Sequence, residues 1–180
     1  MPDLDSNLIA RVLVRDDHAA FGELVRRHQS AVRNFLRHLS RGDAALADDL
    51  AQETFVRAYR SIRRYQGNSS FVSWLLGIAH NLWRNARRQQ RNHVSLDGSE
   101  IDTTNNAAGQ RGSELREDLK SALKTLSSDE QLALHLSYQQ GLSHREIAEL
   151  LDWPLGTVKT HLSRSKEKLR HLLAVWNPQT

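Results

Sequence analysis

The 180-residue chain contains no cysteine, three prolines, and 25 basic against 21 acidic residues, which gives a net charge of +4. It can therefore form no disulfide, no thiolate nucleophile and no cysteine-ligated zinc site. Apolar residues make up 39% and charged residues 26% of it, which is typical of a soluble helical protein, and its basic excess suits a polyanionic partner. No segment approaches the roughly 20 apolar residues of a membrane span, and the N-terminus lacks a signal peptide. We therefore expect a cytoplasmic protein without direct membrane insertion.

Apolar residues recur at helical spacing through most of the chain, and no segment shows the two-residue alternation of strands joined by hairpin turns. This pattern predicts an all-α fold. The first clear helix spans about Asp17 to Leu39 and ends at the sequence "SRGDA". The second spans about Ala44 to Ile62 and has an apolar face. Its opposite face carries Asp48, Asp49, Gln52, Glu53 and Arg57, and taken alone this is a solvated surface.

A polar loop, "RRYQGNSS", separates the second helix from a third, which begins at Phe71. Tyr65 in this loop offers a ring on which a nucleic-acid base can stack, and Gly67 permits close approach of a backbone. The third helix starts with apolar residues, where Phe71 and Trp74 are predicted to pack in the core, and finishes with arginines. The helix dipole favours cations at a C-terminus and explains part of this charge. The pattern does not assign Trp83 to the core or to the surface.

The character of the chain changes at residues 93–112, just after the predicted end of the third helix at Arg91. The sequence "HVSLDGSEIDTTNNAAGQRG" is rich in Gly, Ser, Thr, Asn and Asp, as is typical of a flexible linker, here an acidic one. Helical spacing resumes after it. The chain is therefore predicted to form two small helical domains, residues 1–92 and 113–180, joined by this linker.

The segment "GLSHREIAELLDWPLGTVKTH", residues 141–161, has the pattern of a helix-turn-helix unit. Ser143 and Glu146 form a capping-box sequence at the start of its first helix, and "DWPLG" ends that helix. On the second helix, the apolar residues cluster on one side: Val158, Leu162, Leu169 and Leu172. The other side carries groups suited to phosphates and base edges in a major groove: Lys159, Thr160, Ser163 and Arg164. The unit is predicted to bind DNA.

The C-terminal sequence "GLSHREIAELLDWPLGTVKTHLSRSKEKLRHLL" resembles both the fourth conserved region of bacterial sigma factors and the DNA-binding end of LuxR-type response regulators. The N-terminal half distinguishes them. "ADDLAQETFVRAYRSI" and "YQGNSSFVSWLLGIAHNLWRNARR" resemble the second conserved region of the extracytoplasmic-function (ECF) sigma factors, in the sigma-70 family. A receiver domain would instead show alternating strands and helices. The two resemblances cover about Asp17 to Leu173.

Three positions depart from the pattern of that family. Ser127 stands where members usually have proline, which affects the start of a helix. His80 and His161 stand where arginine is common, and the second substitution removes one expected phosphate contact. Promoter preference therefore cannot be carried over from the family.

The resemblance implies a protein that is not an enzyme, but that binds core RNA polymerase and directs promoter-specific initiation of transcription. It implies that a surface of the second helix docks on the β′ clamp helices: Asp49, Leu50, Gln52, Glu53 and Phe55. It implies that the polar loop and the third helix recognise the minus-10 element: Tyr65, Gln66, Gly67, Asn68, Ser69, Asn81, Arg84, Asn85 and Arg88, with Arg87 as a further phosphate contact. It implies that the helix-turn-helix reads the minus-35 element: Thr157, Lys159, Thr160, Ser163 and Arg164.

The same resemblance implies further partners. They are promoter DNA, the β flap of the polymerase and an anti-sigma factor, which in this family can be membrane-anchored. It places the protein at the nucleoid and the acidic linker near the active cleft of the polymerase. No cofactor and no metal are expected, because the histidines are scattered and no H-E-x-x-H motif, phosphate loop or nucleophile elbow occurs. Two alternatives remain at this stage: a LuxR-like regulator that binds DNA without polymerase, and a helical adaptor that binds only proteins.

Overall fold

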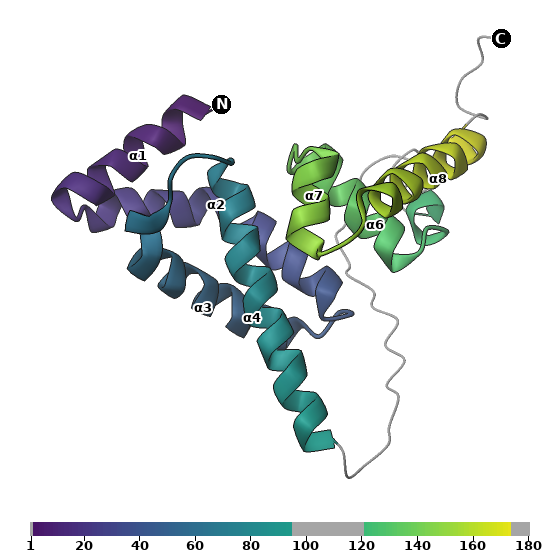
Figure 1. The fold of residues 1–180 in the computed structure, drawn as a ribbon, viewed down its shortest axis with the longest axis horizontal. Coiled ribbons are helices and arrows are strands. Elements are labelled where there is room, and N and C mark those ends of the chain that lie inside the picture. The colour runs from purple at the N-terminus through teal and green to yellow at the C-terminus, as the bar shows by residue number, and fades with distance from the viewer. Residues whose placement is uncertain (1, 95–120, 174–180) are drawn as a thin grey trace. The chain divides into compact units, whose positions relative to one another are not determined.

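The structure is a computed structural model that describes residues 2–94 and 121–173, and within these ranges it is helical without a strand (Figure 1). The chain divides into two compact units, Met1–Asn105 and Asn106–Thr180. An all-α fold of two helical domains is therefore confirmed. None of the helices in the described ranges combines the length and hydropathy that a membrane crossing requires.

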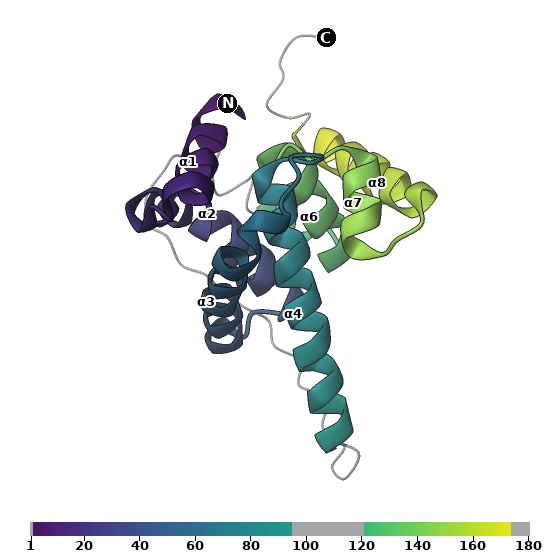
Figure 2. The ribbon, with the colours of Figure 1, turned by 60° about the vertical axis from the view of Figure 1, so that its left-hand side comes forward.

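Unit 1 consists of α1 (Pro2–Arg15), α2 (His18–Leu39), α3 (Ala44–Ser61), the short 3-10 helix η1 (Ile62–Arg64) and α4 (Phe71–Val94). Helices α2, α3 and α4 pack against one another, and α1 lies along α2 (Figures 1 and 2). Their shared core contains the fully buried side chains of Leu24, Phe35, Leu36, Leu75 and Leu76.

Two aspartates begin the central helices of unit 1. The Asp17 carboxylate accepts the backbone N–H of Ala20 at 3.0 Å and caps α2, while Asp43 accepts that of Leu46 at 3.0 Å and caps α3. Between them, Gly42 closes the turn after α2 with a φ of 88°. These caps explain why the helices start within one residue of the predicted positions.

Helix α1 was not predicted from the sequence. It buries Leu8, Ile9 and Val12, and it is tied to α2 by the carboxylate of Asp5, which lies 2.8 Å from His28 Nε2 and 3.3 Å from Arg27 Nη1. Its apolar stripe is short, and the contacts that stabilise it come from α2, so local pattern alone gives little sign of it.

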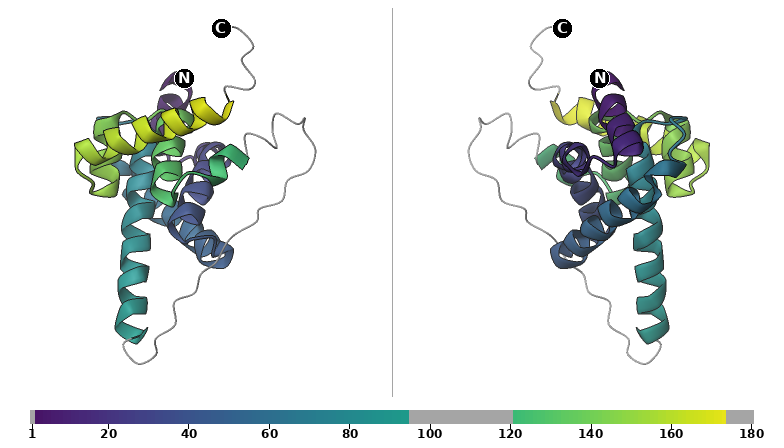
Figure 3. Two further views of the ribbon diagram at one scale, coloured as in Figure 1. Left: turned by 90° about the vertical axis from the view of Figure 1, so that its right-hand side faces the viewer. Right: turned by 90° about the vertical axis from the view of Figure 1, so that its left-hand side faces the viewer.

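Helix α4 is longer than predicted. It continues through Val94, two residues into the predicted linker. Its C-terminal half extends past the N-terminal end of α3 (Figure 3). The rest of the predicted linker, residues 95–112, lies outside the described residues. The predicted domain boundaries therefore stay predictions.

Unit 2 consists of α6 (Ser128–Leu134), a π-helical turn η2 (His135–Gln139), α7 (His144–Leu151) and α8 (Leu155–Leu173), preceded by helical residues 121–124. The predicted capping box is confirmed: Ser143 Oγ accepts the N–H of Glu146 at 3.2 Å, and the Glu146 carboxylate accepts that of Ser143 at 2.8 Å. Asp152, with a φ of 58°, ends α7 in the left-handed conformation. The tight turn before α8 is therefore formed as the sequence predicted.

Candidate nucleic-acid interface

One side of α8 presents polar and basic side chains, while its other side is buried in unit 2 with Val158 and Leu162 in the core. The residues predicted to contact DNA are exposed, except for the first, which is half-buried: Thr157, Lys159, Thr160, Ser163 and Arg164. At about 100° per residue, the four exposed members fall within an arc of roughly 140°. The Thr160 hydroxyl donates to the carbonyl of Gly156 at 2.8 Å, so its lone pairs stay available to accept a hydrogen bond.

Glu130 on α6 holds α8 in place from inside unit 2. Its side chain is only 5% exposed, and its two carboxylate oxygens accept Lys168 Nζ at 2.8 and 3.1 Å. Burial raises the pKa of Glu130, but hydrogen bonds from Lys168 and Ser127 and the charge of Lys168 outweigh it and hold this pKa below its ordinary value. Glu130 is therefore ionised at neutral pH and ties α6 to α8.

Ser127, the residue that replaces a family proline, belongs to the same arrangement. Its backbone N–H donates to the Glu130 carboxylate at 2.9 Å, and its hydroxyl accepts the N–H of Glu130 at 3.2 Å. Proline has no N–H and could not make the first of these bonds. The substitution therefore adds a donor to Glu130 at the helix start.

The predicted minus-10 loop is anchored by Tyr65. Its hydroxyl donates to the carbonyl of Ser69 at 2.7 Å, and its ring lies 5.5 Å from Phe71 and 5.4 Å from Trp74, measured between centroids. Burial and the charge of Asp5 raise the pKa of Tyr65. Phe71 is buried as predicted, whereas Trp74 and Tyr65 are half-buried. The ring of Tyr65 is thus partly occupied by packing inside the protein.

The tip of this loop is open to solvent. Gln66, Gly67 and Asn68 are exposed, and Asn68 Nδ2 donates to Gln66 Oε1 at 3.2 Å. Gly67 has a φ of 74°, a backbone conformation that favours glycine. The tip therefore displays amide groups that can pair with a base edge.

The other predicted minus-10 residues lie along one exposed side of α4: Asn81, Arg84, Asn85 and Arg88. Asn81 is ten residues beyond Phe71, which places it about 15 Å along the axis from the start of the helix. The loop and these residues therefore form two groups along α4. A strand of nucleic acid would have to span both.

Arg87, which was grouped with these phosphate contacts, lies differently. Its guanidinium carbon is 5.3 Å from the centroid of the Trp83 ring, and Trp83 in turn stacks against His80 at 5.8 Å. His80 is buried, and His161, the other histidine that replaces a family arginine, is half-buried 5.2 Å from Trp153. The two histidines thus pack inside their units.

The predicted polymerase-docking residues of α3 separate into two sets. Leu50 and Phe55 are buried in the core of unit 1, so their side chains contribute to packing. Asp49 and Gln52 are exposed, and the half-exposed Glu53 pairs with Arg57, with Oε1 2.7 Å from Nε. The outward part of the predicted surface is therefore polar.

Sequence analysis missed an apolar member of this surface. Val56 is 43% exposed, and at about 100° per residue it lies roughly 20° from Asp49 around α3. Its spacing of seven residues from Asp49, close to two helical turns, could have shown in the sequence that it lies on the same side of the helix. We call Asp49, Gln52, Glu53 and Val56 the α3 face.

Comparison with known proteins agrees with this arrangement. The family described as sigma-70 region 2 matches residues 24–93, which include α3, the loop and α4, and sigma-70 region 4 matches residues 116–169, which include the helix-turn-helix. The chain is 33% identical to the ECF RNA polymerase sigma-E factor of Haemophilus influenzae over 183 residues, which cover 93% of this chain and 94% of that protein. The chain belongs to the ECF sigma factors. The predicted resemblance is thereby confirmed, and the LuxR-like alternative is excluded by the region 2 match.

Other sigma factors are also similar to this chain over most of its length. The chain is 39% identical to the RNA polymerase sigma factor CarQ of Myxococcus xanthus, over 86% of this chain and 89% of that protein. Among solved structures, the sigma factor RpoE of Bartonella quintana, in complex with the anti-sigma factor NepR, has a TM-score of 0.67 and 29% identity over 86% of this chain and 97% of its own. CnrH, in complex with the cytosolic domain of CnrY, shares the fold with a TM-score of 0.57 and 24% identity over 96% and 98%.

Proposed function

We propose that this ECF sigma factor binds core RNA polymerase through the α3 face, the minus-10 element through the Tyr65 loop and α4, and the minus-35 element through α8. The observation that carries the proposal is the two-sided character of α8. Its buried side fixes the helix in unit 2, and its exposed side offers two cations and two hydroxyls within one groove-sized arc. Within the described residues, neither Lys159 nor Arg164 forms an ion pair, so both charges can serve DNA.

The α3 face supports polymerase docking by its composition. The exposed Val56 follows Gln52 and Glu53 by one helical turn and Asp49 by two, so the face combines an apolar side chain with polar ones, as protein interfaces do. A face of this kind fits a helical partner such as the β′ clamp helices. Unit 2 contacts the β flap in the same assembly.

The Tyr65 loop and α4 support recognition of a melted minus-10 strand. Exposed amides at the loop tip suit the edge of an extruded base, and Arg84 and Arg88 suit the phosphates that follow it. The Tyr65 ring is partly packed against Phe71 and Trp74, so a captured base would stack on what remains exposed.

An anti-sigma factor controls this protein in our proposal. The support is the Bartonella quintana sigma factor, whose structure contains a bound anti-sigma factor and matches nearly the whole of this chain. Such a partner, membrane-anchored or free, would cover the polymerase and DNA surfaces. The sigma factor itself acts in the cytoplasm at the nucleoid.

The test is a selection of genomic DNA fragments by core polymerase loaded with the native chain, with Arg164→Ala or with Lys124→Ala. Both residues are exposed cations of unit 2, but Lys124 lies in the helical residues 121–124, outside the helix-turn-helix. Arg164→Ala should reduce the yield or the selectivity of the recovered fragments, while Lys124→Ala should leave both unchanged. Equal yield and equal selectivity of all three proteins would contradict the role of α8.

A further inference from the structure

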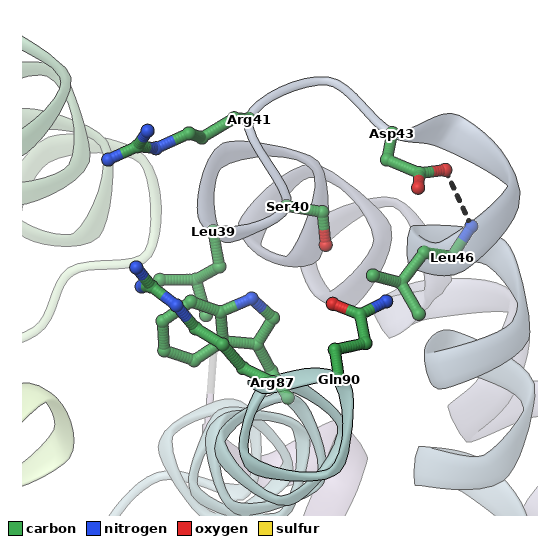
Figure 4. Close-up of a pocket in the computed structure, with 8 residues that line it drawn as sticks. Leu39, Ser40, Arg41, Asp43, Leu46, Arg87 and Gln90 are labelled. Atoms are coloured by element: carbon green, nitrogen blue, oxygen red, sulfur yellow. Dashed lines mark hydrogen bonds between the residues drawn. The ribbon is translucent and has the colours of Figure 1, made fainter. Parts of the chain in front are cut away.

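A pocket of about 200 Å³ lies between the turn that joins α2 to α3 and the side of α4 (Figure 4). Ser40 and Arg41 contribute from the turn, and Trp83, Arg87 and Gln90 contribute from α4. The Gln90 side chain extends from α4 toward Ser40, whereas the Arg87 side chain extends toward the end of the pocket where Arg41 lies (Figure 4). Of the minus-10 residues predicted from the sequence, only Arg87 contributes to its wall, and the α3 face contributes nothing.

One wall of the pocket has an unused hydrogen-bonding group. The Ser40 hydroxyl oxygen is buried and has no hydrogen-bond partner among the described residues. A buried hydroxyl without a partner costs stability, so a ligand that pairs with it would recover that cost. The hydroxyl points into the pocket (Figure 4).

The charge of the pocket is positive at one end. The guanidinium groups of Arg41 and Arg87 lie at the same end, and Asp43 lies at the other, where its carboxylate is engaged in capping α3 (Figure 4). The half-buried Trp83 ring also lines the pocket, and the Arg87 guanidinium carbon lies 5.3 Å from its centroid. An aromatic ring beside guanidinium groups suits a planar group that carries an anion.

A second hollow shares Trp83 and Arg87 with this pocket and adds two arginines of the proposed minus-10 group. It measures about 300 Å³ and is lined by Trp83, Arg84, Arg87 and Arg88. At about 100° per residue, Trp83 lies roughly 160° from Asn81 around the helix, with the arginines between them. A band of positive charge therefore runs from the strand-reading side of α4 to the Trp83 ring.

We propose that Trp83 and Arg87 form a second base-binding site for single-stranded promoter DNA, separate from the Tyr65 loop. A base of the melted strand stacks on the indole, Arg87 moves from the ring to the adjoining phosphate, and Ser40 pairs with the base edge. A pocket of 200 Å³ is smaller than the roughly 300–1,000 Å³ of drug-sized ligand sites, and it suits a single base. This inference rests on the proposed function, because it needs the strand that α4 holds.

The test combines protein variants with single abasic sites along the melted non-template strand. The holoenzyme is assembled from core polymerase and the native chain, Trp83→Leu, Arg87→Gln or the control Arg15→Gln, which removes an exposed arginine from α1. A Tyr65→Leu variant identifies the position of the base that the Tyr65 loop holds. At one other position, removal of the base should weaken the native complex about 5- to 100-fold. The loss at that position should vanish with Trp83→Leu and persist with Arg15→Gln.

Several outcomes would overturn the proposal. One is that an abasic site at every position lowers promoter affinity equally for the native chain and for Trp83→Leu. Another is that Trp83→Leu binds promoter DNA normally and loses only the binding of an anti-sigma factor, which would assign the pocket to a protein partner. Circular dichroism and core binding verify that Trp83→Leu folds. If Trp83→Leu does not fold, Arg87→Gln decides, because it should reduce the salt dependence of promoter binding by about one phosphate contact and Arg15→Gln should not. Failure of the native chain to form any promoter complex would instead refute the proposed function.

Discussion

Lys168 on α8 and Glu130 on α6 form a bidentate ion pair, with Nζ 2.8 and 3.1 Å from the two carboxylate oxygens. Glu130 is also the N3 residue of the capping box that Ser127 begins at the start of α6. One buried carboxylate thus joins the start of α6 to α8, the helix proposed to read DNA. The orientation of the exposed side of α8 therefore depends on a contact between two residues that are 38 positions apart in the chain.

Replacement of Glu130 by glutamine should destabilise unit 2. The variant leaves the Lys168 ammonium without its counter-charge and weakens the cap, and we expect a loss of about 1–3 kcal/mol in the free energy of unfolding. Chemical denaturation followed by circular dichroism measures it. Glu149→Gln, an exposed residue of α7, is the matched control and should change stability little. Equal stability of both variants would show that the ion pair contributes nothing.

The contribution of Glu130 should depend on pH with a definite sign. Its pKa in the folded protein lies below the ordinary value of 4.5. The stabilisation is therefore fully present above that value and is lost as pH falls through the lower folded pKa, where the carboxylate takes up a proton. The stability difference between the native protein and Glu130→Gln should be constant from pH 7 to about 5 and shrink on further acidification. A difference that grows on acidification would contradict the assignment.

Val56→Asp should weaken the binding of core polymerase by about tenfold or more, because it places a charge at the exposed apolar residue of the proposed interface. Val14→Asp is the control, since Val14 on α1 is 80% exposed and lies outside the α3 face. Affinity for core polymerase can be measured by fluorescence anisotropy of the labelled chain. If both variants bind as the native protein does, docking does not use the α3 face.

Arg164→Ala should reduce promoter affinity, and the pattern of the loss should show whether Arg164 contacts a base or a phosphate. A bidentate bond to guanine would cost about 1–3 kcal/mol at one base position, whereas a phosphate contact would weaken all sequences alike and reduce the salt slope by about one. Titration of holoenzyme on matched promoter variants at several salt concentrations separates the two. The Lys124→Ala protein should retain native affinity and slope, because this exposed lysine lies outside the helix-turn-helix.

Much of the fold could be predicted from the sequence, for identifiable physical reasons. The α2 and α3 starts depend on Asp17 and Asp43, whose side chains cap within three residues, and the α7 start depends on the equally local Ser143 and Glu146 pair. Such contacts are visible in a linear pattern. The exposed side of α8 follows from simple helical periodicity in the same way.

What could not be predicted depends on contacts between distant segments. Helix α1 is stabilised by contacts of Asp5 with residues 22 and 23 positions away, and the Glu130 pair joins α6 to α8. The Trp83 pocket exists only because the turn after α2 lies beside α4.

The most direct test of the central claim is run-off transcription by bacterial core polymerase with this protein on a pool of genomic fragments. We predict specific starts with the native chain, impaired promoter selection with Arg164→Ala, and impaired polymerase binding with Glu53→Ala. A protein that bound DNA fragments but never joined the core enzyme or initiated RNA would contradict the proposed function.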